Sequence, residues 1–303
     1  MAATTVQSTK QLFGSVNTRR QFLVAATYAL PTLLRSVPGR FDHVPAAVAR
    51  MEHVNGGRVG VDILDTASGE RTGYRARERF AMCSTFKFML AAAVLSRVDR
   101  HQEELERQVP VPSAPLISNS PLTALNAGGQ MSVADLCQAA LARSDNTAVN
   151  LLLGSIGGPA GLTRFARYAG DTMTRLDRWE PALNEALPGD ARDTTSPKAM
   201  LGNLNSMLLG TVLNPPWRSA LCRWMEANET GMDRLRAHLP GGWCAADKTG
   251  NNGEHTSNDI AIFWTPAARA VIVCAYITQC IGPDSKRAAM LARLGELVIN
   301  AYR

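Results

Sequence analysis

The chain has 303 residues, and a chain of this length can bury a large core without disulfide or metal staples. Hydrophobic residues make up 46% and charged residues 19%, a balance typical of globular rather than disordered chains. The net charge of +6 comes mostly from scattered arginines, without a basic block or interleaved aromatic residues, so we expect no nucleic-acid partner and only a mild attraction to anionic substrates.

The N-terminus carries a predicted export signal. The twin arginines Arg19 and Arg20 precede the apolar stretch 22–34, which is too short to cross a bilayer comfortably. This order is typical of a twin-arginine signal; the alternative is an N-terminal amphipathic helix. We assign residues 1–40 to the signal and expect its removal between Ser36 and Pro45. The protein is then periplasmic or secreted, with no stable membrane anchor after export.

Two strands are predicted at the start of the mature chain. Alternation predicts a strand over Arg58–Asp65, and after a turn at Gly69 a second strand follows from Tyr74 to Phe80. From Ser84 onward the chain is rich in helix formers, which predicts a helix. Gly128-Gly129 then interrupts the chain.

The middle of the chain is predicted to be helical, and its end returns to strands. Ser132 and Asp135 form a capping box for a helix through Ala142. Three more helices are expected over Thr147–Ile156, Pro197–Gly210 and Pro216–Asn228. Strands follow over Trp243–Lys248, Asp259–Trp264 and Val271–Thr278, and an amphipathic helix over Lys286–Tyr302.

Strands at both ends with helices between them predict an α/β (α+β) fold, in which an antiparallel sheet is flanked by helices. We expect a split α/β domain of residues 41–78 and 227–303, with an all-α domain of residues 79–226 inserted into it. The cleft between two such domains is the natural place for a binding site.

The six cysteines do not indicate a metal site. None forms a C-x-x-C pair or lies near histidines at metal-ligand spacing, so we expect neither zinc nor another metal or cofactor. The even count permits disulfides, whose pairing the sequence leaves open. Isolated cysteines in apolar runs, such as Cys274, are more typical of a core.

Ser84-Thr-Phe-Lys87 is the first motif with chemical meaning. Residues three apart share one face of a helix, so Lys87 is expected one turn from the Ser84 hydroxyl. A serine needs an adjacent base to act as a nucleophile, and the start of a helix favours developing negative charge. The alternative is a helix start with a solvated lysine.

Two more short motifs follow. Ser144-Asp145-Asn146 lies between two predicted helices and alternatively forms a helix N-cap. Lys248-Thr249-Gly250 ends a predicted strand, where the lysine and the hydroxyl are suited to hold a carboxylate. Gly250 would let a substrate approach the strand closely; the alternative is a strand-to-turn transition.

In this order, the three motifs resemble the signature of serine β-lactamases and penicillin-binding proteins. The segment 175–193 resembles the omega loop of class A β-lactamases, and with it the resemblance covers residues 41–303. A long loop without periodicity needs internal anchoring, for which Arg175–Asp177 or Arg178–Asp193 pairs are available. The alternative is a mobile surface loop.

The class A resemblance implies a mechanism. Ser84 would attack the lactam carbonyl and give its proton to Lys87, or to Glu180 through a water; both routes stay open. The backbone N–H groups of Ser84 and Asn251 would form the oxyanion hole, and Ser144 would protonate the leaving nitrogen. The result would be hydrolysis of penicillins and cephalosporins, and thereby antibiotic resistance.

The same resemblance implies how the substrate and the hydrolytic water are held. Asn146 would bind the side-chain amide of the substrate, and Lys248 with Thr249 its carboxylate, beside Gly250. Glu180 with Asn184 would hold the deacylating water, and Glu180-Pro181 is similar to the cis bond of the family. A monomer is also implied.

Three positions depart from the family pattern. Ser257 stands where an arginine often assists the substrate carboxylate, and we assign that substrate-binding role to Arg234 instead. Asn119 occupies a gate position that is usually aromatic. Cys83 matches carbapenem-hydrolysing members, but the place of its partner cysteine is Asn252, so we expect no such disulfide and weak carbapenem turnover.

Two rival functions share the three motifs. A D-alanyl-D-alanine peptidase would lack the glutamate loop that carries Glu180 and Asn184. A penicillin sensor would stay acylated and is normally fused to membrane helices. The sequence does not rank penicillins against cephalosporins.

Overall fold

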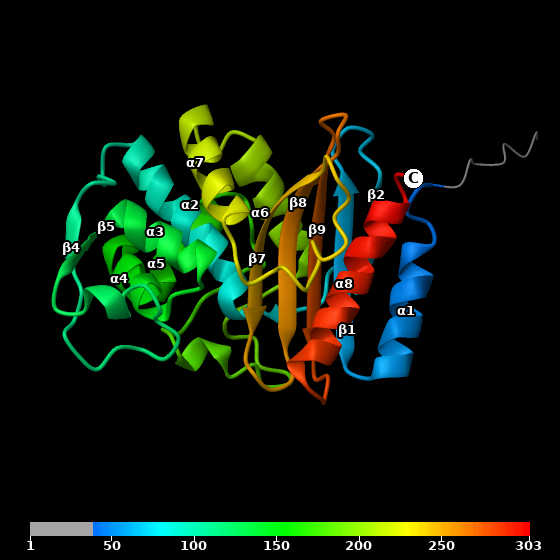
Figure 1. Cartoon of the computed structure of the whole chain (residues 1–303), viewed down its shortest axis with the longest axis horizontal. Coiled ribbons are helices and arrows are strands. Elements are labelled where there is room, and N and C mark those ends of the chain that lie inside the picture. Colours follow the sequence, from blue (N-terminus) through cyan, green and yellow to red (C-terminus); the bar gives the residue numbers. More distant parts are fainter. Residues whose placement is uncertain (1–38) are drawn as a thin grey trace, which may run out of the picture. The chain divides into compact units, whose positions relative to one another are not determined.

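The structure is a computed structural model, and it describes residues 39–303. All but the last two residues of the predicted signal segment 1–40 lie outside the described residues. None of the helices within residues 39–303 combines the length and the apolar character that a bilayer crossing requires. The described chain forms a mixed α/β fold around one large antiparallel sheet (Figure 1).

The sheet has five strands in the order β2-β1-β9-β8-β7. Their bounds are β1 Arg58–Asp65, β2 Arg71–Tyr74, β7 Cys244–Asn251, β8 Ser257–Trp264 and β9 Ala270–Thr278. Every neighbouring pair is antiparallel, which confirms the predicted sheet type. The predicted strand over Arg58–Asp65 is confirmed residue for residue. Because β7 is an edge strand, one side of its backbone has no strand partner among residues 39–303.

Both faces of the central strands are buried. Side chains alternate along β9, so that Val271 and Val273 belong to one hydrophobic cluster and Ile272 and Cys274 to the other. The first face is covered by α1 (Val44–Asn55) and α8 (Asp284–Asn300), which lie side by side in Figure 1. Burial on both faces explains why β9 is an apolar run from Ala270 to Ile277 rather than an alternation of apolar and polar residues.

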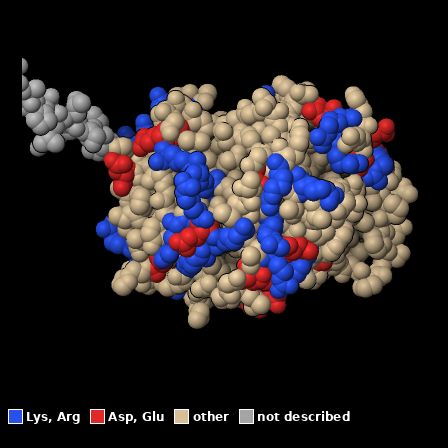
Figure 2. Space-filling view, turned by 180° about the vertical axis from the view of Figure 1, so that it is seen from behind, with Lys and Arg blue, Asp and Glu red and all other residues tan. Residues whose placement is uncertain are grey.

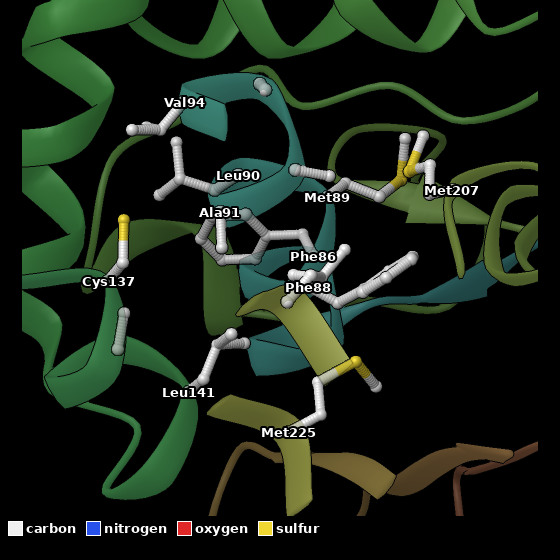
Figure 3. Packing of buried hydrophobic residues seen from close by; sticks show 14 of the residues in the cluster. Phe86, Phe88, Met89, Leu90, Ala91, Val94, Cys137, Leu141, Met207 and Met225 are labelled. Carbon is white, nitrogen blue, oxygen red and sulfur yellow. The ribbon is translucent and has the colours of Figure 1, made fainter. Parts of the chain in front are cut away.

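The opposite face of the sheet meets the helical part of the molecule. Its helices are α2 Phe86–Asp99, α3 Val133–Ala142, α4 Asn146–Ile156, α5 Gly158–Tyr168, α6 Pro197–Leu204 and α7 Pro215–Glu226. The central helix is α2, which is buried from Phe86 through Ser96. Figure 3 shows Phe86 and Leu90 of α2 packed among side chains that include Leu141 and Met225. This packing fixes the start of α2, where the Ser84 motif lies.

Shorter elements connect these layers. The two-stranded pairs are β3 Phe80–Ala81 with β6 Thr194–Thr195, and β4 Gln108–Pro110 with β5 Gln130–Ser132. The short helical turns are η1 Cys83–Thr85, η2 Ala124–Asn126, η3 Ala182–Asn184 and η4 Asn205–Leu209. The pairing of β3 with β6 ties the segment before Ser84 to the end of the 175–193 loop.

Two element predictions need correction. The predicted strand from Tyr74 to Phe80 is wrong, because β2 ends at Tyr74 and Arg75 takes a positive φ of 48°. The predicted helix Pro197–Gly210 is α-helical only to Leu204 and then continues as the π-type turn η4. The capping box is confirmed, because the Asp135 amide donates to the Ser132 hydroxyl at 3.0 Å.

Two helices were not predicted. The α1 helix follows directly on the segment assigned to the signal, where no element was expected. The α5 helix begins with Gly158 and Pro159 and contains Gly161, a composition of low helix propensity. Tertiary packing decides here: a Cβ at Gly161 would meet the Ile156 carbonyl oxygen at 2.0 Å, so only glycine permits this close approach.

The cysteines and the surface charge agree with the composition. All six cysteines are free thiols, and Cys274 is fully buried, as the prediction of a core role requires. Basic side chains on the face seen in Figure 2 occur in separate clusters interleaved with acidic ones. The predicted surface charge pattern without a continuous basic block therefore fits this face.

Candidate active site

Ser84 lies on the turn η1, immediately before the buried helix α2. It lines a pocket of about 250 Å³. The other lining residues are Asn119, Arg143, Ser144, Asn146, Asn184, Thr230, Thr249, Gly250 and Asn251. The preceding residue, Cys83, is buried and has a positive φ of 43°, a conformation that costs a non-glycine residue free energy. Backbone strain of this kind clusters at functional sites.

Lys87 follows one helical turn later and is fully buried, so the alternative of a solvated lysine is wrong. Its Nζ donates to the Ser144 carbonyl oxygen at 2.8 Å and to Asn146 Oδ1 at 2.6 Å. Its ion pair with Glu180 Oε1 spans 3.2 Å. Burial lowers the pKa of Lys87, and the Glu180 carboxylate opposes that shift. Within residues 39–303, no hydrogen bond joins Lys87 to Ser84.

The Ser144-Asp145-Asn146 motif forms the predicted helix N-cap and also lies at the Ser84 pocket. Asp145 is the N-cap of α4, since its side chain accepts the Ala148 amide at 2.9 Å. Ser144 has a positive φ of 55°. Its hydroxyl accepts hydrogen bonds from Lys87 Nζ and Lys248 Nζ, both at 3.2 Å. Because a hydroxyl has two lone pairs and one proton, these two bonds leave the Ser144 proton available for donation.

Lys248 and Thr249 lie within β7, which runs three residues past the predicted strand end, so the strand-to-turn alternative is wrong. Lys248 is fully buried, and its pKa is lowered to about 7 by burial and by the neighbouring Lys87 charge. Thr249 contacts the Thr230 hydroxyl at 2.5 Å and lines the pocket. The motif thus contributes the Thr249 hydroxyl to the pocket wall, and the Lys248 ammonium lies behind that wall, 3.2 Å from the Ser144 hydroxyl.

Gly250 lies directly against the turn that carries Ser84. A Cβ at this position would be 2.8 Å from the Met82 carbonyl oxygen and 2.9 Å from the Ser84 backbone nitrogen. The strand can approach the Ser84 amide this closely only because residue 250 has no side chain. The close approach predicted for a substrate at Gly250 is therefore made, in the structure, by the protein's own backbone.

The loop of residues 175–193 is anchored by internal ion pairs, which excludes the mobile-loop alternative. Arg178 Nε contacts Asp193 Oδ2 at 2.6 Å, and Arg175 Nε contacts Asp177 Oδ2 at 2.9 Å, so both predicted pairs are confirmed. The carboxylate of Asp193 also accepts the backbone amides of residues 177 and 178. The loop is consequently held from inside rather than by its ends alone.

Glu180 is buried at the inner edge of this loop, and its peptide bond to Pro181 is cis, as predicted. The Asn184 side chain donates to Glu180 Oε2 at 2.6 Å. Asn150, which was not among the predicted site residues, exchanges two hydrogen bonds with the Glu180 backbone at 3.0 and 3.1 Å. Its position four residues after Asn146 places it on the same face of α4, and this spacing could have indicated it.

The three departing positions have distinct environments. Arg234 is buried and contacts the Ser257 hydroxyl and, at 3.0 Å, Asp284 Oδ2. It does not line the Ser84 pocket. Asn119 does line it and donates to the Ser144 carbonyl oxygen at 2.9 Å. The side chain of Asn252 accepts three amides of the β7–β8 turn at 3.1, 3.1 and 3.0 Å.

Comparisons with known proteins agree with this geometry. Residues 44–302 match the model of a family described as "Beta-lactamase enzyme family". Beta-lactamase L2 of Stenotrophomonas maltophilia is 45% identical over 294 residues, which cover 92% of this chain and 97% of that protein. Beta-lactamase CTX-M-8 of Citrobacter amalonaticus is 41% identical, with 93% and 98% covered.

Solved structures show the same similarity. An ancestral class A β-lactamase of Gram-negative bacteria has a TM-score of 0.83 and 51% identity, covering 85% of this chain and 99% of its own. A β-lactamase from Xanthomonas campestris has a TM-score of 0.85 and 47% identity, covering 88% and 100%. At these identities the proteins share not only the fold but also about half of their aligned residues.

Proposed function

This chain belongs to class A of the β-lactamase enzyme family, and from that premise we propose that it hydrolyses penicillins and cephalosporins through an acyl-enzyme on Ser84. The observation that carries the proposal is the convergence of Lys87, Ser144, Lys248 and Glu180 beside the Ser84 pocket. Catalysis of this kind makes the protein a serine β-lactamase that confers antibiotic resistance.

Acylation requires a base, an oxyanion hole and a proton donor. Lys87 with its lowered pKa, or Glu180 through a water, takes the Ser84 proton; the contact of Lys87 with Glu180 at 3.2 Å keeps both routes open. The amides of Ser84 and Asn251 bind the developing oxyanion, beside Gly250. Ser144, whose proton is available, protonates the lactam nitrogen as the C–N bond breaks.

Substrate binding uses the two sides of the pocket. Lys248 and Thr249 take the ring carboxylate, because the Thr249 hydroxyl lines the pocket and the Lys248 cation lies directly behind the lining, bonded to the Ser144 hydroxyl. Asn146 binds the side-chain amide of the substrate. Glu180 and Asn184, joined at 2.6 Å, hold the water that hydrolyses the acyl-enzyme. The residues need no metal or cofactor for this sequence of steps.

Three further properties belong to the proposal. The predicted division into a split α/β domain, residues 41–78 and 227–303, and an inserted all-α domain, residues 79–226, places Ser84 where the two meet. The twin arginines at positions 19 and 20 support export to the periplasm or the medium. After removal of the signal, the mature protein acts as a monomer without a stable membrane anchor.

The test is intact-mass spectrometry after mixing with benzylpenicillin, for the wild type and Glu180→Ala side by side. We expect the wild type to return to its free mass while substrate is consumed. Glu180→Ala should keep one penicilloyl group about a hundredfold longer or more, because the water loses its general base. A wild type that also stays acylated would identify a penicillin-binding peptidase or a sensor instead.

Arg234 assists the substrate carboxylate indirectly, through its contact with the Ser257 hydroxyl and through its charge, which acts on Lys248. We expect Arg234→Ala to raise KM for benzylpenicillin about five- to tenfold and to weaken inhibition by clavulanate. Its charge also contributes to the lowered pKa of Lys248. Without that charge the Lys248 pKa rises above about 7. The decline of kcat/KM on the alkaline side of its pH profile, called the basic limb, should therefore move to higher pH.

Arg234→Lys is the matched control because it keeps a cation at this position. It should retain most of the clavulanate inhibition and a basic limb close to that of the wild type. Unchanged KM, inhibition and pH profile in Arg234→Ala would show that Arg234 has only a structural role, in its contacts with Ser257 and Asp284.

A further inference from the structure

Among the described residues that line the Ser84 pocket, Arg143 is the one that is formally charged. It is the C-cap of α3 and immediately precedes Ser144, whose backbone and hydroxyl contact Lys87. The two buried lysines lie behind the lining, so Arg143 is the cation that a bound molecule meets first. The proposed mechanism gives Arg143 no role.

Arg143 forms an ion pair with Glu229 across the rim of the pocket. The two side chains are 42% and 60% exposed, so this pair is weak and exchangeable. The Glu229 amide donates to the Ala142 carbonyl oxygen at 3.0 Å, which docks the segment after α7 onto the end of α3. The carboxylate is therefore held near Arg143 by the backbone, while the pair itself can open.

The position of this pair relative to the substrate follows from its neighbours. Glu229 adjoins Thr230, whose hydroxyl contacts Thr249 at 2.5 Å. Thr249 belongs to the wall that takes the ring carboxylate in the proposed function. Arg143 thus lies beyond the carboxylate end of the substrate, whereas the amide side chain of the substrate binds at Asn146 in the proposed function.

We propose that Arg143 is a specificity-determining residue that binds a second negative charge on the ring substituent next to the substrate carboxylate. This inference rests on the proposed function and narrows its substrate class to cephalosporins with an anionic group at that ring carbon. Such a group displaces Glu229 from Arg143 and exchanges one exposed ion pair for another. Glu229 acts as a competitor that neutralises Arg143 when no such substrate is bound.

The test compares two cephalosporins that differ only at this ring carbon, one with a carboxymethyl and one with the isosteric carbamoylmethyl group. In the wild type we expect kcat/KM to favour the carboxylate about fivefold, mainly through KM. Arg143→Gln should bring this ratio to about one, and Arg143→Lys should keep part of it. Glu229→Gln should raise it about threefold, because the competing carboxylate is gone.

Arg293→Gln is the control for net charge, since Arg293 is half exposed in a similar ion pair on α8. It should leave the ratio unchanged, and 0.5 M salt should reduce the ratio of the wild type but not of Arg143→Gln. An equal ratio in wild type and Arg143→Gln, or an equal loss in Arg293→Gln, overturns this inference alone. Failure of the wild type to hydrolyse either cephalosporin overturns the cephalosporin part of the proposed function as well, whereas the benzylpenicillin experiment tests the acyl-enzyme mechanism separately.

Discussion

Replacing Ser84 by alanine is expected to lower kcat for benzylpenicillin by about five to six orders of magnitude, because the variant has no nucleophile for the acyl-enzyme. The neighbouring thiol cannot substitute for it. Cys83 is fully buried, and burial raises its pKa to about 12, so the thiolate is absent at neutral pH. Intact-mass spectrometry of Ser84→Ala should accordingly show no penicilloyl adduct at any time.

The double variant Ser84→Ala/Glu180→Ala separates the two chemical steps. Residues that act in sequence on one intermediate are not additive, so the double variant should be no slower than Ser84→Ala alone. Glu180→Ala by itself retains the adduct, whereas both Ser84 variants should lack it. The melting temperature of Ser84→Ala should stay close to that of the wild type, since a half-buried hydroxyl is the only group removed. Residual adduct in Ser84→Ala would place the nucleophile elsewhere.

The chemistry of this site was predictable from short motifs because each is local. Ser84 and Lys87 share a helix face, and Lys248 and Thr249 follow each other on one strand, so spacing alone places them. The contact of Lys87 with Ser144 and Asn146 brings together residues 57 and 59 positions apart, and the sequence does not show it. Only the family resemblance, not the spacing, indicated that these motifs share one pocket.

Other features depended on tertiary packing and were missed for that reason. The α5 helix has poor local propensity and forms because Leu162 and Phe165 pack into the core. In the Tyr74–Phe80 segment only the two terminal aromatic residues favour a strand, and Arg75 turns the chain away, so that β2 and β3 have different partners. Arg143 belongs to none of the short motifs, and its proposed role at the pocket rim could be inferred only from its position in the structure, beside Glu229.

Glycine is required at position 250 by the packing of the protein itself, which the Lys-Thr-Gly motif alone does not indicate. A Cβ there would lie 2.8 Å from the Met82 carbonyl oxygen, 2.9 Å from the Ser84 nitrogen and 3.0 Å from the Thr85 nitrogen. All three are backbone atoms of the turn that carries the nucleophile, so they cannot rotate away. Either this turn or the edge strand β7 must move, and each carries one proposed oxyanion donor.

We therefore expect Gly250→Ala to lower kcat about a thousandfold, because misaligning one oxyanion donor already costs about a hundred- to a thousandfold. The added methyl group should also destabilise the fold by about 1–3 kcal/mol, as overpacking does in other cores. Acylation rates measured by stopped-flow with nitrocefin, and melting temperatures measured by calorimetry, report the two effects separately.

Gly202→Ala is the matched control for the same chemical change. Gly202 lies in α6, where a Cβ would have no neighbour within 4 Å and the backbone is helical. This substitution should leave kcat unchanged and stabilise the helix by about 0.5–1 kcal/mol, because alanine has the higher helix propensity. Wild-type acylation in Gly250→Ala would contradict the prediction. It would mean that β7 can move away from the turn that carries Ser84 without displacing the Ser84 amide. If it lost acylation but melted like the wild type, the contact at Gly250 would act on alignment of the oxyanion hole alone.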